Sequence, residues 1–212
     1  MQNKKLKKEY LRVGSNALAS YGGNQGWLKS KALSGYGCGL IAGNDLVMYL
    51  SGETAMADIE TYKARIKKER FIYPIINYFG IAGIMLAPSI KLDMIKHHLP
   101  YSVRWGVFPK NLRKTCEEML ENDIPVIFSV CQVFNFLWKP AGLQLYRKNS
   151  SGELVPCTRA SSHYMTLTAL DGDEMTVSSW GNKYYASWKE YEHLVRRRSF
   201  WVFSNIVKVT KK

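Results

Sequence analysis

The sequence predicts a single α+β domain over residues 1–212, with a helical half at about residues 1–123 and a sheet half at about residues 124–212. Two observations lead to this prediction. Apolar residues recur at helical spacing in the first half, whereas short β-branched and aromatic runs separated by turn residues fill the second. Helices followed by a meandering antiparallel sheet are typical of the α+β class.

The first half is expected to contain a central buried helix and three others. Residues 38–51 (CGLIAGNDLVMYLS) are apolar on nearly every face, as in a buried helix, and Gly35 and Gly37 supply a turn before them. Serine, proline or acidic residues mark the ends of the other helices, which we expect at residues 58–77, 89–99 and 109–121.

The second half is expected to form antiparallel strands. Residues 124–134 (IPVIFSVCQVF) are rich in strand formers, residues 149–152 (NSSG) form a hairpin turn, and residues 161–170 alternate between two faces. Further strands are expected at residues 143–147, 153–158, 175–179, 183–186 and 200–209, with a short helix at 188–195.

Composition excludes several protein classes. With 46% hydrophobic and 13% aromatic residues, the chain is too apolar to be disordered, and it is neither collagen-like nor a small disulfide scaffold. The four cysteines form no CxxC pair, so a reduced compartment is the simpler interpretation. The basic N-terminus has no apolar core of signal-peptide type, and we therefore expect a cytoplasmic protein.

Charge and hydropathy leave two further alternatives open. The formal net charge of +13 favours acidic partners, but no nucleic-acid-binding motif accompanies the basic clusters, so nucleic acid is not the expected partner. Residues 71–90 carry no charge and follow a basic flank, as a membrane span does. Because this stretch contains two prolines and two glycines, we prefer a buried helix and a loop that ends at Pro88.

Cys38 and His163 are the candidate catalytic pair. Cys38 stands between two glycines at the start of the buried helix, where the helix dipole and backbone N–H groups lower a thiol pKa. His163 lies in the alternating strand, where a single histidine is ordinarily a core residue. We also single out Ser178, which the turn at residues 171–173 brings toward His163, and Gln25, whose amide can stabilise an oxyanion.

These motifs, in this order, resemble the papain-like cysteine peptidases, and especially the bacterial branch related to double-glycine leader peptidases. The resemblance covers residues 21–187 through Gln25, Gly-Cys38-Gly, Ser-His163-Tyr and Ser178-Ser-Trp-Gly. It implies a papain-like fold in which Cys38 is the nucleophile, His163 the general base and Gln25 the oxyanion-hole amide. Trp180 then resembles the tryptophan that shields the bond between the histidine and its orienting residue.

Two departures from the family pattern bear on activity. Gln25 precedes Cys38 by 13 residues, so an insertion must absorb the extra length, or Asn24 takes the role. Ser178 occupies the position of the family's Asn or Asp, and its hydroxyl carries no charge to stabilise an imidazolium. Ser179 and Asp171 are alternative orienting residues.

The sequence therefore favours a thiol peptidase or amidase acting on a peptide or amide substrate, with no cofactor and no metal ion. A thiol acyltransferase, a catalytically degenerate peptide-binding module and a membrane-surface protein are the alternatives. His97 and His98 are assigned to a helix end, where cationic histidine suits the dipole, and no metal-ligating partner is expected beside them. The remaining cysteines, Cys116, Cys131 and Cys157, are expected at buried apolar positions.

Overall fold

The computed structural model describes residues 3–14, 19–56, 58–76, 80–132, 135–200 and 202–212. The helices are α1 Lys31–Tyr36, α2 Cys38–Ser51, α3 Ile59–Glu69, α4 Gly83–Lys96, α5 Leu112–Glu121 and α6 Trp188–His193. The strands are β1 Lys4–Lys5, β2 Arg12–Val13, β3 Ser20–Tyr21, β4 Ala55–Met56, β5 Tyr101–Trp105, β6 Val126–Val130, β7 Leu143–Lys148, β8 Leu154–Ala160, β9 His163–Asp171, β10 Glu174–Ser179, β11 Asn182–Ser187 and β12 Val207–Lys211.

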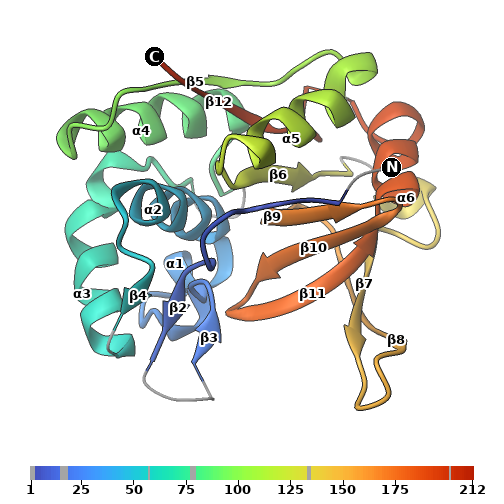
Figure 1. Cartoon of the computed structure of the whole chain (residues 1–212), viewed down its shortest axis with the longest axis horizontal. Coiled ribbons are helices and arrows are strands. Elements are labelled where there is room, and N and C mark those ends of the chain that lie inside the picture. Colours follow the sequence, from blue (N-terminus) through green and yellow to red (C-terminus); the bar gives the residue numbers. More distant parts are fainter. Residues whose placement is uncertain (1–2, 15–18, 57, 77–79, 133–134, 201) are drawn as a thin grey trace.

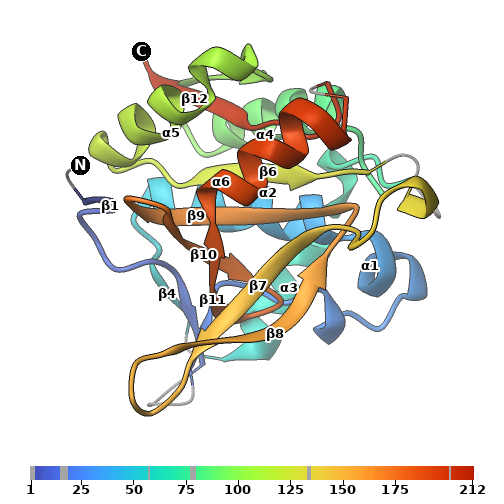
Figure 2. The ribbon, with the colours of Figure 1, turned by 90° about the vertical axis from the view of Figure 1, so that its right-hand side faces the viewer.

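A seven-stranded antiparallel sheet forms the larger layer. Its strands follow the order β1-β9-β10-β11-β7-β8, and β6 also pairs with β9. Helices α1 to α4 gather on one side of the molecule and strands β9 to β11 on the other, and the β7–β8 hairpin extends beyond the body (Figures 1 and 2). The predicted α+β class is therefore confirmed.

Helix α2 is the centre of the hydrophobic core. Every residue from Gly39 to Tyr49 is buried, in agreement with the apolar character of the segment on nearly every face. The helix packs against β9 and α4. The Tyr73 ring lies directly against Gly43, and a Cβ on this residue would be only 2.6 Å from the ring. Gly52 ends the helix in the left-handed conformation, with φ 87°. This packing fixes the Cys38 end of α2 against the sheet.

Helix α4 begins earlier than predicted and contains Pro88, so the expected loop ending at Pro88 is wrong. The proline removes one helical hydrogen bond. Burial of the face that includes Leu86, Ile90 and Met94 offsets this cost. The predicted helix at residues 58–77 is shorter: α3 ends at Glu69 and a single 3₁₀ turn follows. Residue 77 lies outside the described residues.

The predicted helical half also contains five strands that the sequence did not reveal. Four of them have only two residues, too short for any periodicity, and β5 pairs with the distant β12. Strand β12 itself begins at Val207, later than the predicted residue 200, and residue 201 lies outside the described residues. Among the described helices, none is both long enough and apolar enough to cross a membrane.

Gly83 allows the start of α4 to lie directly against Trp105. A Cβ on Gly83 would lie 2.2 Å from the indole ring, so Gly83→Ala is expected to destabilise the protein by about 1–3 kcal/mol. Urea unfolding measures this change. Gly35→Ala is the matched control in α1, because a Cβ there meets no described atom within 4 Å, and it is expected to stabilise by up to about 1 kcal/mol. Equal stability of the two variants would contradict this packing.

Candidate active site

One small cavity brings together the residues that the sequence singled out. Its lining comes from four separate elements: the 3₁₀ turn at Gln25, the start of α2, the start of β9, and the end of β10 with the turn after it. The residues concerned are Gln25, Cys38, His163, Ser178, Ser179 and Trp180. The cavity volume is about 20 Å³, enough for about one water molecule. The candidate residues therefore lie around one narrow space.

Cys38 is the first residue of α2 and is partly exposed. Burial raises the pKa of the Cys38 thiol above its usual value, while nearby backbone N–H groups, those of Tyr164 and Gly39 among them, oppose that rise. The predicted lowering of the thiol pKa is therefore not what this arrangement gives, because desolvation outweighs the helix terminus. The contact with the Tyr164 backbone also brings the sulfur to the residue that follows His163.

His163 begins β9 and is 8% exposed. Its Nε2 atom lies 2.8 Å from Ser179 Oγ, and its ring stacks on Trp180 with centroids 4.3 Å apart. Burial lowers the pKa of the His163 imidazole to about 3, so the ring is neutral at neutral pH. Trp180 thus stacks on the same imidazole that contacts the Ser179 hydroxyl.

Ser179, and not Ser178, is the hydrogen-bond partner of His163. Ser178 Oγ instead donates to the Tyr21 carbonyl oxygen at 2.7 Å, so the expected role of Ser178 as the orienting group does not match its contacts. The register between β9 and β10 shifts between Thr176 and Val177, which the alternation of the sequence alone cannot show. Asp171 ends β9 at the far end of the strand from His163, about 26 Å along the chain.

The turn between β10 and β11 positions Trp180. Both of its central residues, Trp180 and Gly181, have positive φ, 47° and 71°, as a type I′ hairpin turn requires. A bulky residue in this region is unusual, and such strain is often found at functional sites. The predicted Ser-Trp-Gly motif is therefore a tight turn that holds the indole over the imidazole.

Gln25 lies at the cavity but its amide is already engaged. Nε2 donates to the carbonyl oxygens of Ser34 at 2.9 Å and Gly35 at 3.2 Å, which uses both amide hydrogens. Asn24, the alternative, accepts from Gly26 N–H through Oδ1. The extra chain between Gln25 and Cys38 forms a 3₁₀ turn and α1, so the expected insertion is helical.

Asp45 is a residue of the cavity that the sequence analysis did not select. It follows Cys38 by seven residues, two helical turns along the same face of α2. It is 2% exposed, and it accepts hydrogen bonds from Gly23 N–H at 2.8 Å and the Tyr62 hydroxyl at 2.6 Å. Burial raises the pKa of the Asp45 carboxyl to about 7. Its presence could have been noticed in the sequence, because Asp45 is the one carboxylate in the mainly apolar segment that forms α2.

The other cysteines differ partly from expectation. Cys116 is buried, Cys131 is intermediate and Cys157 is exposed, so the prediction of burial is correct only for the first. None of the four cysteines, all in described segments, forms a disulfide. His193 is exposed at the end of α6.

Comparisons with known proteins find no match, either to a protein-family model or to a curated protein sequence.

The low pKa of His163 predicts an acid-sensitive fold. The folded-state pKa of about 3 lies below the ordinary value of 6.5, so the unfolded state binds more protons between these pH values and stability falls as the pH decreases. The free energy of unfolding attributable to His163 is expected to drop by roughly 2–3 kcal/mol from about pH 7 to about pH 4.5. Urea unfolding of the wild type and of His163→Gln at several pH values measures this drop, as the difference between the two proteins in how the free energy of unfolding changes with pH.

The exposed His193 provides the control for this measurement. His193→Gln is expected to keep the wild-type pH profile, since an exposed histidine has similar surroundings in both states. Parallel profiles for the wild type and His163→Gln would contradict the buried neutral imidazole.

Proposed function

We propose that the chain is a papain-like thiol peptidase or amidase that cleaves a peptide or amide bond through an acyl-enzyme on Cys38. The observation that carries the proposal is the cavity that Cys38, at a helix N-terminus, lines together with His163, whose ring contacts Ser179 and Trp180. Nucleophile, base and orienting group form the set that covalent acyl transfer requires. The packing of α2 on an antiparallel sheet also supports a papain-like architecture.

In the first step, the neutral His163 imidazole accepts the thiol proton while the Cys38 sulfur attacks the substrate carbonyl carbon. Ser179 favours this role, because a hydroxyl that accepts from Nε2–H leaves Nδ1 as the basic nitrogen. The raised pKa of Cys38 and the lowered pKa of His163 argue for proton transfer during attack rather than a stable ion pair beforehand.

In the second step, the tetrahedral intermediate collapses to a thioester, and the imidazolium returns its proton to the leaving amine. Water then attacks the thioester, with His163 again as base, and releases the carboxylic acid and the Cys38 thiol. The backbone N–H groups at the start of α2 lie beside the sulfur and would act as donors for the oxyanion. Since Ser179 carries no charge, it stabilises the imidazolium less than an aspartate would.

A peptide-binding module without catalysis is the second candidate function. The specific observation in its favour is that both Gln25 amide hydrogens are bonded to loop carbonyls, so no side-chain donor of Gln25 is free for an oxyanion. The cavity must also widen before a peptide carbonyl can reach Cys38, because it has room for about one water molecule.

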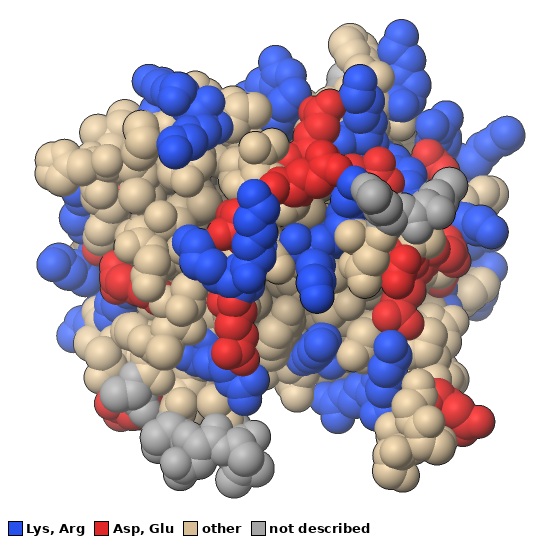
Figure 3. Space-filling model, in the orientation of Figure 1, with Lys and Arg blue, Asp and Glu red and all other residues tan. Residues whose placement is uncertain are grey.

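The charge of the chain favours acidic substrates. Lys and Arg are spread over the face in Figure 3 with Asp and Glu among them, and the net charge is +13. A dispersed positive field raises the association rate of acidic peptides without selecting a cleavage sequence.

An unbiased peptide mixture tests the proposal. The wild type and Cys38→Ala are incubated separately with the mixture, and the products are sequenced by mass spectrometry. New peptide ends produced by the wild type alone are expected. Products that carry an added amine would instead indicate acyl transfer, and intact peptides retained without cleavage would overturn hydrolysis in favour of the binding module.

A further inference from the structure

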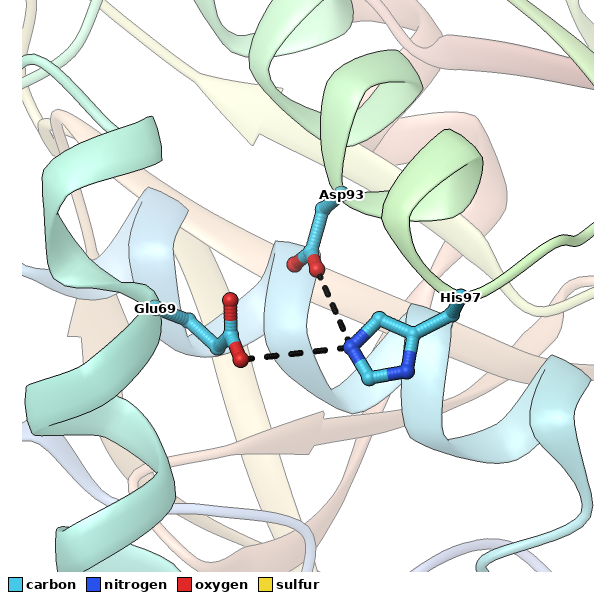
Figure 4. A group of neighbouring side chains, drawn as sticks. All are labelled: Glu69, Asp93 and His97. Atoms are coloured by element: carbon cyan, nitrogen blue, oxygen red, sulfur yellow. Dashed lines mark ion pairs between the residues drawn. The ribbon is translucent and has the colours of Figure 1, made fainter.

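A buried group of two carboxylates and one imidazole lies between α3 and α4, apart from the candidate active site. Glu69 is the last residue of α3, Asp93 lies in the last turns of α4, and His97 follows that helix. Asp93 and His97 are four residues apart and so share one face. Figure 4 shows both carboxylates directed toward the imidazole. None of the three lines the cavity at Cys38.

The distances suit three ligands of one cation. His97 Nε2 lies 3.5 Å from Asp93 Oδ1 and 3.9 Å from Glu69 Oε1, and the three ligand atoms lie within 4.8 Å of one another. Ligands about 2.0–2.1 Å from a tetrahedral zinc ion are separated by about 3.3 Å. Small side-chain movements would therefore complete the coordination.

Two atoms at the centre of the group have no hydrogen-bond partner. Within the part of the chain that the structure describes, Asp93 Oδ1 and His97 Nε2 are buried and make no hydrogen bond. Asp93 is fully buried, so its free oxygen cannot turn to water. A neutral imidazole could donate to only one of the two carboxylates, whereas a cation would satisfy all three ligand atoms.

The surrounding contacts hold the outer carboxylate oxygens and leave the inner ones for a ligand. The Tyr73 hydroxyl donates to Asp93 Oδ2 at 2.8 Å, and Lys96 Nζ pairs with Glu69 Oε2 at 2.6 Å. Hydrogen bonds and ion pairs from neighbouring side chains to a carboxylate orient it as a metal ligand. Lys96 offsets one of the two carboxylate charges, and the nearby Arg65 is paired with Glu53 at 2.7 Å, so the formal charge of these five side chains is −1, which favours a cation.

We propose that Glu69, Asp93 and His97 bind one divalent transition-metal ion, with Zn²⁺ as the representative, and that this ion joins α3 to α4. One imidazole with two carboxylates suits Zn²⁺ and its neighbours better than Ca²⁺ or Mg²⁺, which prefer oxygen ligands alone. His97 is the partly exposed member of the group, so an ion and a water molecule as fourth ligand would enter from its side. No metal ion was predicted from the sequence at His97, although Asp93 precedes it by one helical turn.

Cobalt titration of the chelator-treated full-length chain tests the site. The Cys38→Ala variant serves as background, since it removes the thiol that could bind cobalt at the other site. We expect one Co²⁺ per chain, with visible d–d absorption and no sulfur-to-cobalt charge-transfer band. Adding His97→Ala or Asp93→Asn to this background is expected to weaken binding by at least about tenfold.

His193→Ala is the matched control, because it removes an exposed histidine outside the group and is expected to leave cobalt affinity unchanged. Thermal unfolding provides a second readout: Zn²⁺ should raise the melting temperature of the background but not of the Asp93→Asn variant. Circular dichroism verifies that each variant is folded. Absence of saturable Co²⁺ binding, or binding that survives both His97→Ala and Asp93→Asn, would overturn the proposal and would not affect the proposed activity at Cys38.

Discussion

Cys38→Ala is expected to abolish acyl-enzyme formation, and His163→Ala is expected to slow it by at least about a hundredfold, the usual contribution of a general base. The reason is that a thiol whose pKa burial has raised is not nucleophilic at neutral pH without a neighbouring base. Intact-mass spectrometry after brief exposure to a peptide thioester measures the acylated fraction. Equal acylation of the wild type and His163→Ala would contradict the catalytic pair.

The two adjacent serines provide a sharper comparison of the same site. Ser179→Ala removes the hydroxyl beside His163 Nε2 and is expected to lower kcat by roughly tenfold or more, whereas Ser178→Ala should have a smaller effect because its hydroxyl bonds to Tyr21. Steady-state kinetics on any substrate found by the peptide screen separates the two. A larger loss in Ser178→Ala would contradict the assignment.

Asp45→Ala is expected to destabilise the fold by about 3 kcal/mol or more at about pH 5, since it leaves the Gly23 N–H and the Tyr62 hydroxyl buried without an acceptor. The penalty should decrease with pH. The folded-state pKa of about 7 lies above the ordinary 3.8, so the folded state binds more protons between these values and the contribution of Asp45 falls by roughly 2–3 kcal/mol from about pH 5 to about pH 8.

Urea unfolding at several pH values measures the Asp45 effect, and Asp171→Ala is the matched control. Asp171 is exposed at the end of β9, so its replacement should change stability by less than about 0.5 kcal/mol. A pH-independent penalty for Asp45→Ala would show that the carboxyl does not titrate near neutrality in the fold.

Local sequence patterns predicted most of the fold. The continuous apolar character of α2 indicated a buried helix, and the alternation over β9 with the turn residues after it indicated the hairpin with β10. Helix α4 was placed too late because Pro88 signals a break, whereas burial of its apolar face stabilises a helix through the proline. The short strands depend on distant partners, which local patterns do not contain.

The sequence predicted which residues lie at the candidate site, but it did not predict which of them contact one another. The order of the motifs along the chain predicted that Gln25, Cys38 and His163 lie together, and in the structure all three line one cavity. The choice between Ser178 and Ser179 depends on a register shift, and the thiol pKa depends on burial, so neither follows from residue identity. The group of Glu69, Asp93 and His97 likewise arises only when α3 and α4 pack together.

The burial of α2 from Gly39 to Tyr49 also determines which side of the cavity can move. An element buried on all faces opens only when the whole domain unfolds, so its amide hydrogens should be among the slowest to exchange with solvent. The Cys38 end of the cavity is then a fixed wall. For the proposed activity, a peptide would then have to enter at the opposite wall, where hydrogen bonds hold the tight turn carrying Trp180 and the loop carrying Gln25. These two segments are expected to open at lower free energy than α2.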